Sequence, residues 1–135
     1  MARKTSTPRK RIFILETREF PEKIKEDLKL YGYERELSFR SSISKSSFRK
    51  NLPEDFDLYL LHISNTDEEA IEELRRKQSW SKIFIRTSMD AEIPFTLKGI
   101  VDGKYDISNI QYCEKVLGSV GARVKSWEEI YGEMN

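Results

Sequence analysis

The sequence predicts an α/β fold of three layers, in which helices cover both faces of a mostly parallel, five-stranded sheet. Short apolar runs alternate along the chain with longer segments whose apolar residues recur at helical spacing. Connections of helical length suit parallel strands, whose two faces must both be covered. The chain has 135 residues, 38% of them hydrophobic, which is enough for one domain with one sheet at its centre.

The first half of the chain begins with an apolar run at residues 12–15 (IFIL), which predicts a strand buried on both faces. Residues 21–31 start with proline and end before Gly32, and their apolar residues have helical spacing. Residues 36–39 predict a short strand at the edge of the sheet. The serine-rich residues 41–50 predict a weak helix or a mobile segment.

Residues 58–63 (LYLLHI) are the strongest strand prediction in the chain, and we expect them at the centre of the sheet. Residues 68–77 predict a helix, because acidic side chains come first and basic ones last, as the helix dipole favours. The next buried strand is expected over residues 83–87 (IFIRT).

The segment 89–105 is expected to add an extra strand or hairpin, because apolar residues alternate from Ile93 to Leu97. Asp102-Gly103 would form its turn. A helix is then expected from Ile107 to near Gly118 or Gly121.

The carboxyl-terminal residues complete the pattern. Residues 122–125 (ARVK) predict a last short strand, and residues 127–131 predict one or two final helical turns.

The composition excludes several classes of protein. No apolar run approaches the roughly 18 residues of a membrane span, and no apolar segment follows the basic start as a secretion signal would require. A single cysteine, Cys113, allows neither an internal disulfide nor a multi-cysteine zinc site, and it falls on the apolar stripe of its helix. The phosphate-binding motifs GxGxxG and GxxxxGK[ST] are both absent. We therefore expect a cytoplasmic protein without a metal or other cofactor.

The charge is unevenly distributed, although the net charge is only +1. Residues 1–10 are expected to form a flexible basic arm, and residues 11–135 a single domain. Arg9, Lys10 and Arg11 are candidate contacts to nucleic acid. The alternative, which we favour, is a solvated terminus.

Four segments resemble the receiver domain of two-component response regulators. Residues 12–17 (IFILET) are similar to the receiver strand that ends in an acidic pair, and residues 55–63 (DFDLYLLHI) to the strand whose end bears the phosphoacceptor aspartate. Residues 83–88 (IFIRTS) are similar to the strand that ends in a threonine or serine contacting the phosphoryl group. Residues 121–125 (GARVK) are similar to the strand that ends in lysine. The resemblance implies a flavodoxin-like sheet.

The resemblance also implies a pocket at the carboxyl ends of these strands. Lys98 is a second candidate for the receiver lysine, but choosing it would remove one helix, so Lys125 is preferred. The expected pocket residues are Glu16, Thr17, His62, Thr87, Ser88 and Lys125.

Two departures from the receiver pattern point to a degenerate, or pseudo-receiver, domain. His62 stands at the phosphoacceptor position, and Glu16-Thr17 stands in place of the acidic pair. An acyl phosphate requires a carboxylate nucleophile, and Mg²⁺ requires several oxygen ligands. We therefore expect that the domain does not take up phosphate as receivers do.

Three functions follow from these observations. The first is a non-catalytic signalling or regulatory module that binds a protein partner. The second is a small nucleic-acid-associated protein that uses the basic arm and residues 75–80 (RRKQSW). The third is an enzyme that uses His62, Glu16 and nearby hydroxyls. A lone histidine is more often structural, so we do not expect an enzyme.

Overall fold

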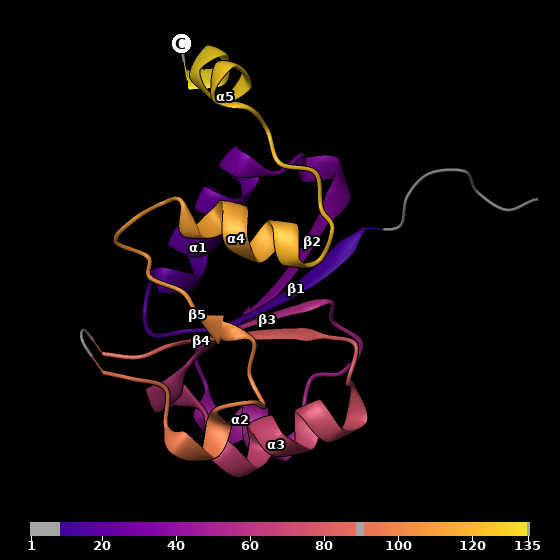
Figure 1. Cartoon of the computed structure of the whole chain (residues 1–135), viewed down its shortest axis with the longest axis vertical. Coiled ribbons are helices and arrows are strands. Elements are labelled where there is room, and N and C mark those ends of the chain that lie inside the picture. Colours follow the sequence, from indigo (N-terminus) through magenta and orange to yellow (C-terminus); the bar gives the residue numbers. More distant parts are fainter. Residues whose placement is uncertain (1–8, 89–90, 135) are drawn as a thin grey trace, which may run out of the picture.

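The computed structural model of the protein describes residues 9–88 and 91–134. Within these ranges all five strands run parallel in one sheet, in the spatial order β2-β1-β3-β4-β5 (Figure 1). The predicted three-layer α/β class and its flavodoxin-like strand order are confirmed. The strands are β1 (Lys10–Leu15), β2 (Leu37–Ser42), β3 (Leu58–His62), β4 (Lys82–Arg86) and β5 (Gly103–Lys104).

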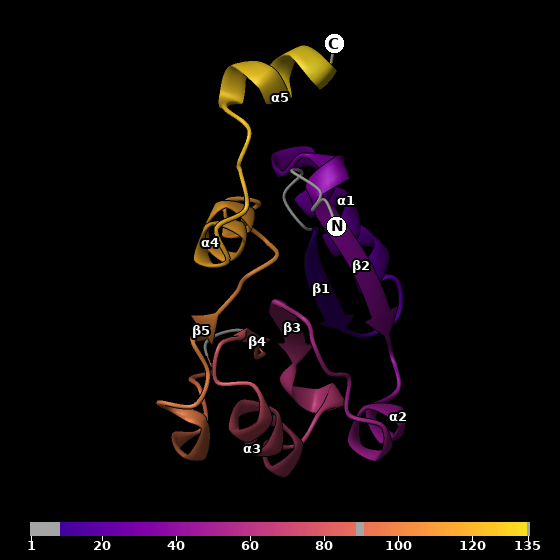
Figure 2. The ribbon, with the colours of Figure 1, turned by 90° about the vertical axis from the view of Figure 1, so that its right-hand side faces the viewer.

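Helices cover both faces of the sheet, with α1 and α4 on one side and α2 and α3 on the other (Figures 1 and 2). The side chains of β1 alternate between the two layers, as the pleat of a strand requires. Ile12 and Ile14 pack with α1 and α4, whereas Phe13 and Leu15 pack with α2 and α3. The helices are α1 (Phe20–Tyr31), α2 (Lys45–Lys50), α3 (Glu68–Lys77), α4 (Tyr112–Ser119) and α5 (Trp127–Met134).

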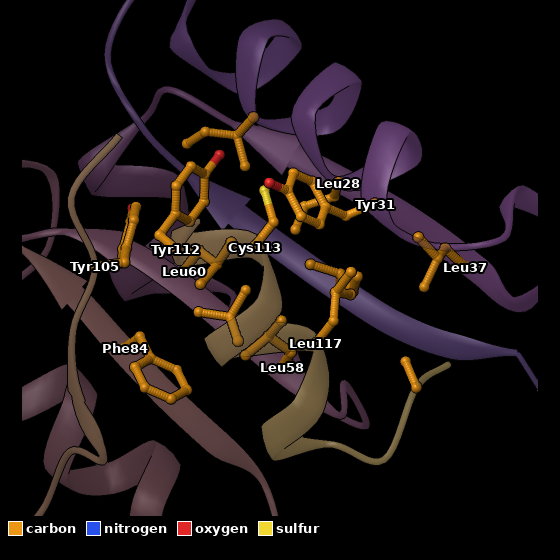
Figure 3. Close-up of a cluster of buried hydrophobic side chains, with 14 of the residues drawn as sticks. Leu28, Tyr31, Leu37, Leu58, Leu60, Phe84, Tyr105, Tyr112, Cys113 and Leu117 are labelled. Carbon is orange, nitrogen blue, oxygen red and sulfur yellow. The ribbon is translucent and has the colours of Figure 1, made fainter. Parts of the chain in front are cut away.

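The three strands predicted to be central are buried. The apolar side chains of β1, β3 and β4 are each at most 4% exposed, and β2 lies at the edge, as predicted. Cys113 lies in the layer between α1 and α4, among Leu28, Tyr31 and Leu117 (Figure 3). Burial raises the pKa of its thiol to about 12, so this cysteine has the environment of a small core residue.

The expected extra strand or hairpin within residues 89–105 is not formed, and the fifth strand lies elsewhere than predicted. Phe95–Leu97 form a single 3₁₀ turn after Pro94. Asp102-Gly103 is not a hairpin turn, because the Asp102 amide donates to the Ile83 carbonyl at 2.7 Å and leads directly into β5.

Residues 122–125 do not form the last strand. Val124 makes only an isolated antiparallel bridge with Gly32, at the end of α1. The helix expected from Ile107 begins later, at Tyr112. The side chains of Asp106 and Asn109 accept hydrogen bonds from backbone amides two residues ahead, which favours turns over helix.

The arm was predicted over residues 1–10. Residues 1–8 of it lie outside the residues that the structure describes. Lys10, the last residue of the predicted arm, is the first residue of β1. No helix among residues 9–88 and 91–134 is long and apolar enough to cross a membrane.

Candidate functional site

A cluster of polar side chains lies at the carboxyl ends of the parallel strands. Glu16 directly follows β1, His62 ends β3, Arg86 ends β4 and Tyr105 directly follows β5. The register pairs His62 with Arg86, so the ends of β3 and β4 are level. In this strand order the connections change direction between β1 and β3, which is where doubly wound sheets bind their ligands.

The carboxylate of Glu16 is completely buried and accepts four hydrogen bonds, the longest of them from the Thr17 amide at 3.4 Å. Arg86 donates from Nε to Oε2 and from Nη2 to Oε1, each at 2.7 Å. The Tyr105 hydroxyl donates to Oε2 at 2.6 Å. Bidentate guanidinium–carboxylate pairs are among the strongest hydrogen-bonded contacts in proteins, and burial increases their electrostatic strength. Both carboxylate oxygens are therefore engaged within the protein.

Arg86 and Tyr105 both keep their protons beside Glu16. The hydrogen bond to Glu16 raises the pKa of Arg86, whose guanidinium lies 4.9 Å from the centre of the Phe20 ring. Complete burial, together with the charge of Glu16, raises the pKa of Tyr105 well above its usual value. The phenol therefore remains a hydrogen-bond donor to the carboxylate.

His62 is half-buried and its Nδ1 atom accepts two hydrogen bonds from Ser64. The Ser64 amide lies 3.2 Å and the Ser64 hydroxyl 2.5 Å from Nδ1. Burial lowers the pKa of His62, Arg86 lowers it further, and Glu16 opposes both. A neutral imidazole that accepts at Nδ1 carries its proton on Nε2.

Thr17, Thr87 and Ser88 lie at the same edge of the sheet. The Thr87 hydroxyl donates to the carbonyls of Ala91, at 2.9 Å, and Ser88, at 3.2 Å. The Thr17 carbonyl accepts from the Phe20 amide at the start of α1. The Thr87 hydroxyl is thus engaged by backbone carbonyls, and Ser88 is exposed to solvent.

Lys125 does not lie at this edge, and its assignment to the pocket is corrected. Its amide donates to the Tyr31 carbonyl at the end of α1, and its Nζ atom pairs with Glu133 at 2.7 Å. Because α1 connects the end of β1 to the start of the parallel strand β2, the end of α1 lies near the amino ends of the strands. Lys98, the other candidate, follows the 3₁₀ turn and is exposed. The lysine that β5 brings to this edge is Lys104, whose Nζ atom donates to the Ala91 carbonyl.

Two of the three candidate nucleic-acid contacts are used within the protein. The Arg11 guanidinium donates to the Asp55 carbonyl at 2.8 Å and lies 4.3 Å from the centre of the Phe56 ring. Arg9 donates to the Leu37 carbonyl at 3.3 Å. Arg75, in the second candidate region, donates to four carbonyls and to Asp102. Of the residues from 75 to 80, Arg76, Lys77 and Trp80 are the exposed basic or aromatic ones.

Arg86, Tyr105 and Lys104 are the site residues that sequence reasoning missed. The one signal in the sequence was Arg86 itself, a charged residue that ends an otherwise apolar buried strand. Such a position implies a buried counter-charge. Among the described residues, no three His, Cys, Asp or Glu side chains gather in a way that could hold a metal ion.

The comparisons with solved structures agree with this architecture. A response regulator receiver domain (CheY-like) from Methylobacillus flagellatus superposes with a TM-score of 0.64, at 13% identity over 84% of this chain and 99% of that one. TrrA, a response regulator from Thermotoga maritima solved with Mg²⁺ and BeF, gives a TM-score of 0.55, at 19% identity over 93% and 96%. An atypical orphan response regulator gives a TM-score of 0.57, at 11% identity over 82% and 94%.

The chain is thus a three-layer α/β protein of flavodoxin-like topology. Within that class it has the fold of response regulator receiver domains, as the resemblance implied. Neither a family model nor a curated protein matches the sequence.

Proposed function

We propose that the protein is a receiver-like signalling or regulatory module that acts by binding a protein partner and does not take up phosphate at the ends of its strands. The observation that carries this proposal is the fully engaged carboxylate of Glu16, held by Arg86 and Tyr105. A group with both oxygens bonded inside the protein is poorly placed to bind an incoming cation or phosphoryl group.

The chemistry of phosphoryl transfer supports the same proposal. Transfer to a side chain that yields an acyl phosphate needs a carboxylate nucleophile, and Mg²⁺ has to neutralise the charge on the transferred group. His62 ends β3, and its Nδ1 atom already accepts from Ser64. Phosphorylation of the imidazole would give a phosphoramidate of different geometry. Arg86 donates to both oxygens of Glu16, the atoms that a metal ion would need as ligands.

One structural neighbour gives a parallel for regulation without phosphate. The structure of the atypical orphan response regulator revealed a phosphorylation-independent regulatory mechanism in that protein. By analogy, this domain would be held in one state or switched by its partner. We also propose a cytoplasmic location, which the cysteine usage favours, and no enzymatic activity.

A direct test is incubation of the protein with acetyl phosphate and Mg²⁺, followed by intact-mass measurement and amide NMR spectra. A phosphorylatable receiver domain treated in parallel is the positive control. We expect no mass increase and no Mg²⁺-dependent shifts at Glu16 or His62. A phosphorylated species, or shifts centred on these two residues, would refute the proposal.

A further inference from the structure

A surface groove lies between α2 and α3, and none of its lining residues belongs to the cluster around Glu16. Its volume is about 1160 Å³. The groove exists because α2 has only six residues and buries only Phe48, so it leaves part of this layer uncovered. Figure 2 shows these two helices side by side below the sheet.

The groove is lined by apolar side chains and by charged side chains, and we call the charged ones its rim. Leu52, Ile63 and Ala70 are the apolar ones, and Leu52 and Ile63 are half-buried. Eight charged side chains line the rim, five acidic and three basic, which leaves an excess of two negative charges.

Most of the basic groups on the rim are already paired with acidic ones. Arg49 pairs with Asp67, and Lys77 is shared between Glu54, at 3.1 Å, and Glu73, at 3.6 Å. These ion pairs do not change the net charge of the rim, which keeps its excess of two negative charges. A positively charged occupant would complement it.

Thr66 provides a second, independent sign of an occupant. It lines the groove, is 3% exposed, and its hydroxyl has no hydrogen-bond partner among the described residues. An unpaired buried hydroxyl costs free energy, and native structures satisfy nearly all such groups. Rotation about χ1 exchanges the hydroxyl and methyl positions of threonine, so the hydroxyl can reach a group seated in the groove.

We propose that this groove binds a lysine- or arginine-rich amphipathic segment of a partner protein. The apolar side chains of the segment would pack on Leu52, Ile63 and Ala70, and its basic side chains would lie against Glu69 and Glu73. A polar group of the segment would complete the hydrogen bonding of Thr66. The inference rests on the proposed function, because it names the surface and the chemistry of the protein partner.

Other occupants fit these features less well. The phosphates of a nucleic acid would be repelled by the excess of carboxylates. The described residues contain no group of three side chains suited to a metal ion. Small-molecule pockets are lined mostly by apolar side chains, whereas eight charged side chains line this open groove.

The test uses two fluorescent peptides that share their leucine positions, one with lysine and one with glutamate at the polar positions. Binding to the full chain is followed by fluorescence anisotropy at low ionic strength and mapped by amide NMR. We expect the lysine peptide to bind and to shift the signals of Leu52, Ile63, Thr66 and Ala70. No binding, equal binding of both peptides, or shifts confined to another surface would overturn the proposal.

Matched variants make the test specific to the groove. The double variant Glu69→Lys, Glu73→Lys should weaken binding of the lysine peptide about tenfold, because two rim charges are reversed. Glu26→Lys, an exposed position on α1 across the sheet, should leave the affinity unchanged. Equal losses in both variants would show that only overall charge matters, which would refute the assignment to the groove.

Thr66→Val distinguishes a binding role from a structural one, because valine keeps the shape and removes the hydroxyl. We expect its affinity for the lysine peptide to fall about fivefold, the loss of one hydrogen bond, while the thermal midpoint stays the same or rises. An unchanged affinity would exclude Thr66 from the site. Failure of the peptide tests leaves the phosphodonor result intact, so the two proposals fail separately.

Discussion

Arg86 and Glu16 form a bidentate ion pair that joins two strands that are not neighbours in the sheet. Glu16 follows β1 and Arg86 ends β4, with β3 between them, and both hydrogen bonds measure 2.7 Å. Glu16 is completely buried and the Arg86 side chain is 18% exposed. Each charge is therefore stabilised by the other instead of by water. The pair lies at the carboxyl ends of the strands, where doubly wound sheets bind their ligands.

Glu16→Gln should destabilise the protein by about 3–5 kcal/mol, because it leaves a largely buried guanidinium without its counter-charge. The double variant Glu16→Leu, Arg86→Met removes both charges and should recover part of that loss, because the buried Tyr105 hydroxyl still loses its acceptor. Urea unfolding of the wild type and both variants measures the free energies. A double variant less stable than Glu16→Gln would contradict this account of the pair.

Tyr105→Phe should cost about 1.5–3 kcal/mol, since its hydroxyl donates to an ionised group inside the core. Tyr112→Phe is the matched control. Its hydroxyl donates to Asp27 at 3.1 Å, and Asp27 keeps an ion pair with Lys23 at 3.0 Å. Chemical denaturation should rank Tyr105→Phe as the more damaging change, and the reverse order would contradict the prediction.

His62 should make stability fall as the solution becomes acidic. Its pKa is lowered in the folded protein, mainly by burial, so the unfolded chain binds a proton first. The stability contribution is complete above about pH 6.5, the ordinary pKa of histidine, and decreases as pH falls toward the folded pKa. His62→Gln should have a flatter stability profile across this window. Identical slopes for variant and wild type between about pH 7 and 5 would rule out this effect.

The central strands and the helix α3 were predictable because their signals are local. Residues 12–15, 58–63 and 83–87 are apolar runs, and the order of charges in residues 68–77 matches the helix dipole. The strand β5 was not predictable in the same way. It has two residues, Gly103 and Lys104, and tertiary contacts position it rather than an apolar pattern.

The site was predictable only in part. Glu16 and His62 were found because the carboxyl ends of parallel strands lie next to one another in a sheet. Arg86 and Tyr105 lie 70 and 89 residues from Glu16 in sequence, so no local spacing connects them. Lys125 was misplaced because a basic residue after a short apolar segment looks the same whether or not that segment pairs with the sheet.

Asp67→Ala should destabilise α3 by about 1 kcal/mol, because Asp67 accepts from the Ala70 amide at 2.7 Å and caps the helix. Burial raises the pKa of Asp67, but the Ala70 amide and the Arg49 guanidinium outweigh it and lower the pKa overall. The stabilisation is therefore present above the unfolded pKa of about 3.9 and is lost as pH falls through the lower folded value. Thermal unfolding at neutral and acidic pH tests both parts. A loss of the same size at both pH values would contradict the ionic component.

Arg75 holds the turn after α3 to the start of β5 through several acceptors at once. Its guanidinium donates to the Ile100 carbonyl at 2.8 Å, to the Ser81 carbonyl at 2.8 Å and to the Asp102 carboxylate at 2.8 Å. Arg75→Ala should cost about 2–3 kcal/mol, because several partly buried acceptors lose their donor together. A lysine has one compact ammonium group and cannot reach all of these acceptors, so Arg75→Lys should recover only part of the loss.

Arg76→Ala is the matched control, since Arg76 is the next residue and is exposed. Its stability should change by less than about 0.5 kcal/mol, as expected for a surface substitution. If Arg75→Ala leaves the urea midpoint unchanged, the role of Arg75 in fixing β5 is wrong.

The same variants test the nucleic-acid alternative in a titration with generic duplex DNA and RNA at low salt. We expect no binding by the wild type. If it binds and Arg76→Ala weakens that binding without changing stability, residues 75–80 contact nucleic acid and the protein-binding proposal loses its advantage.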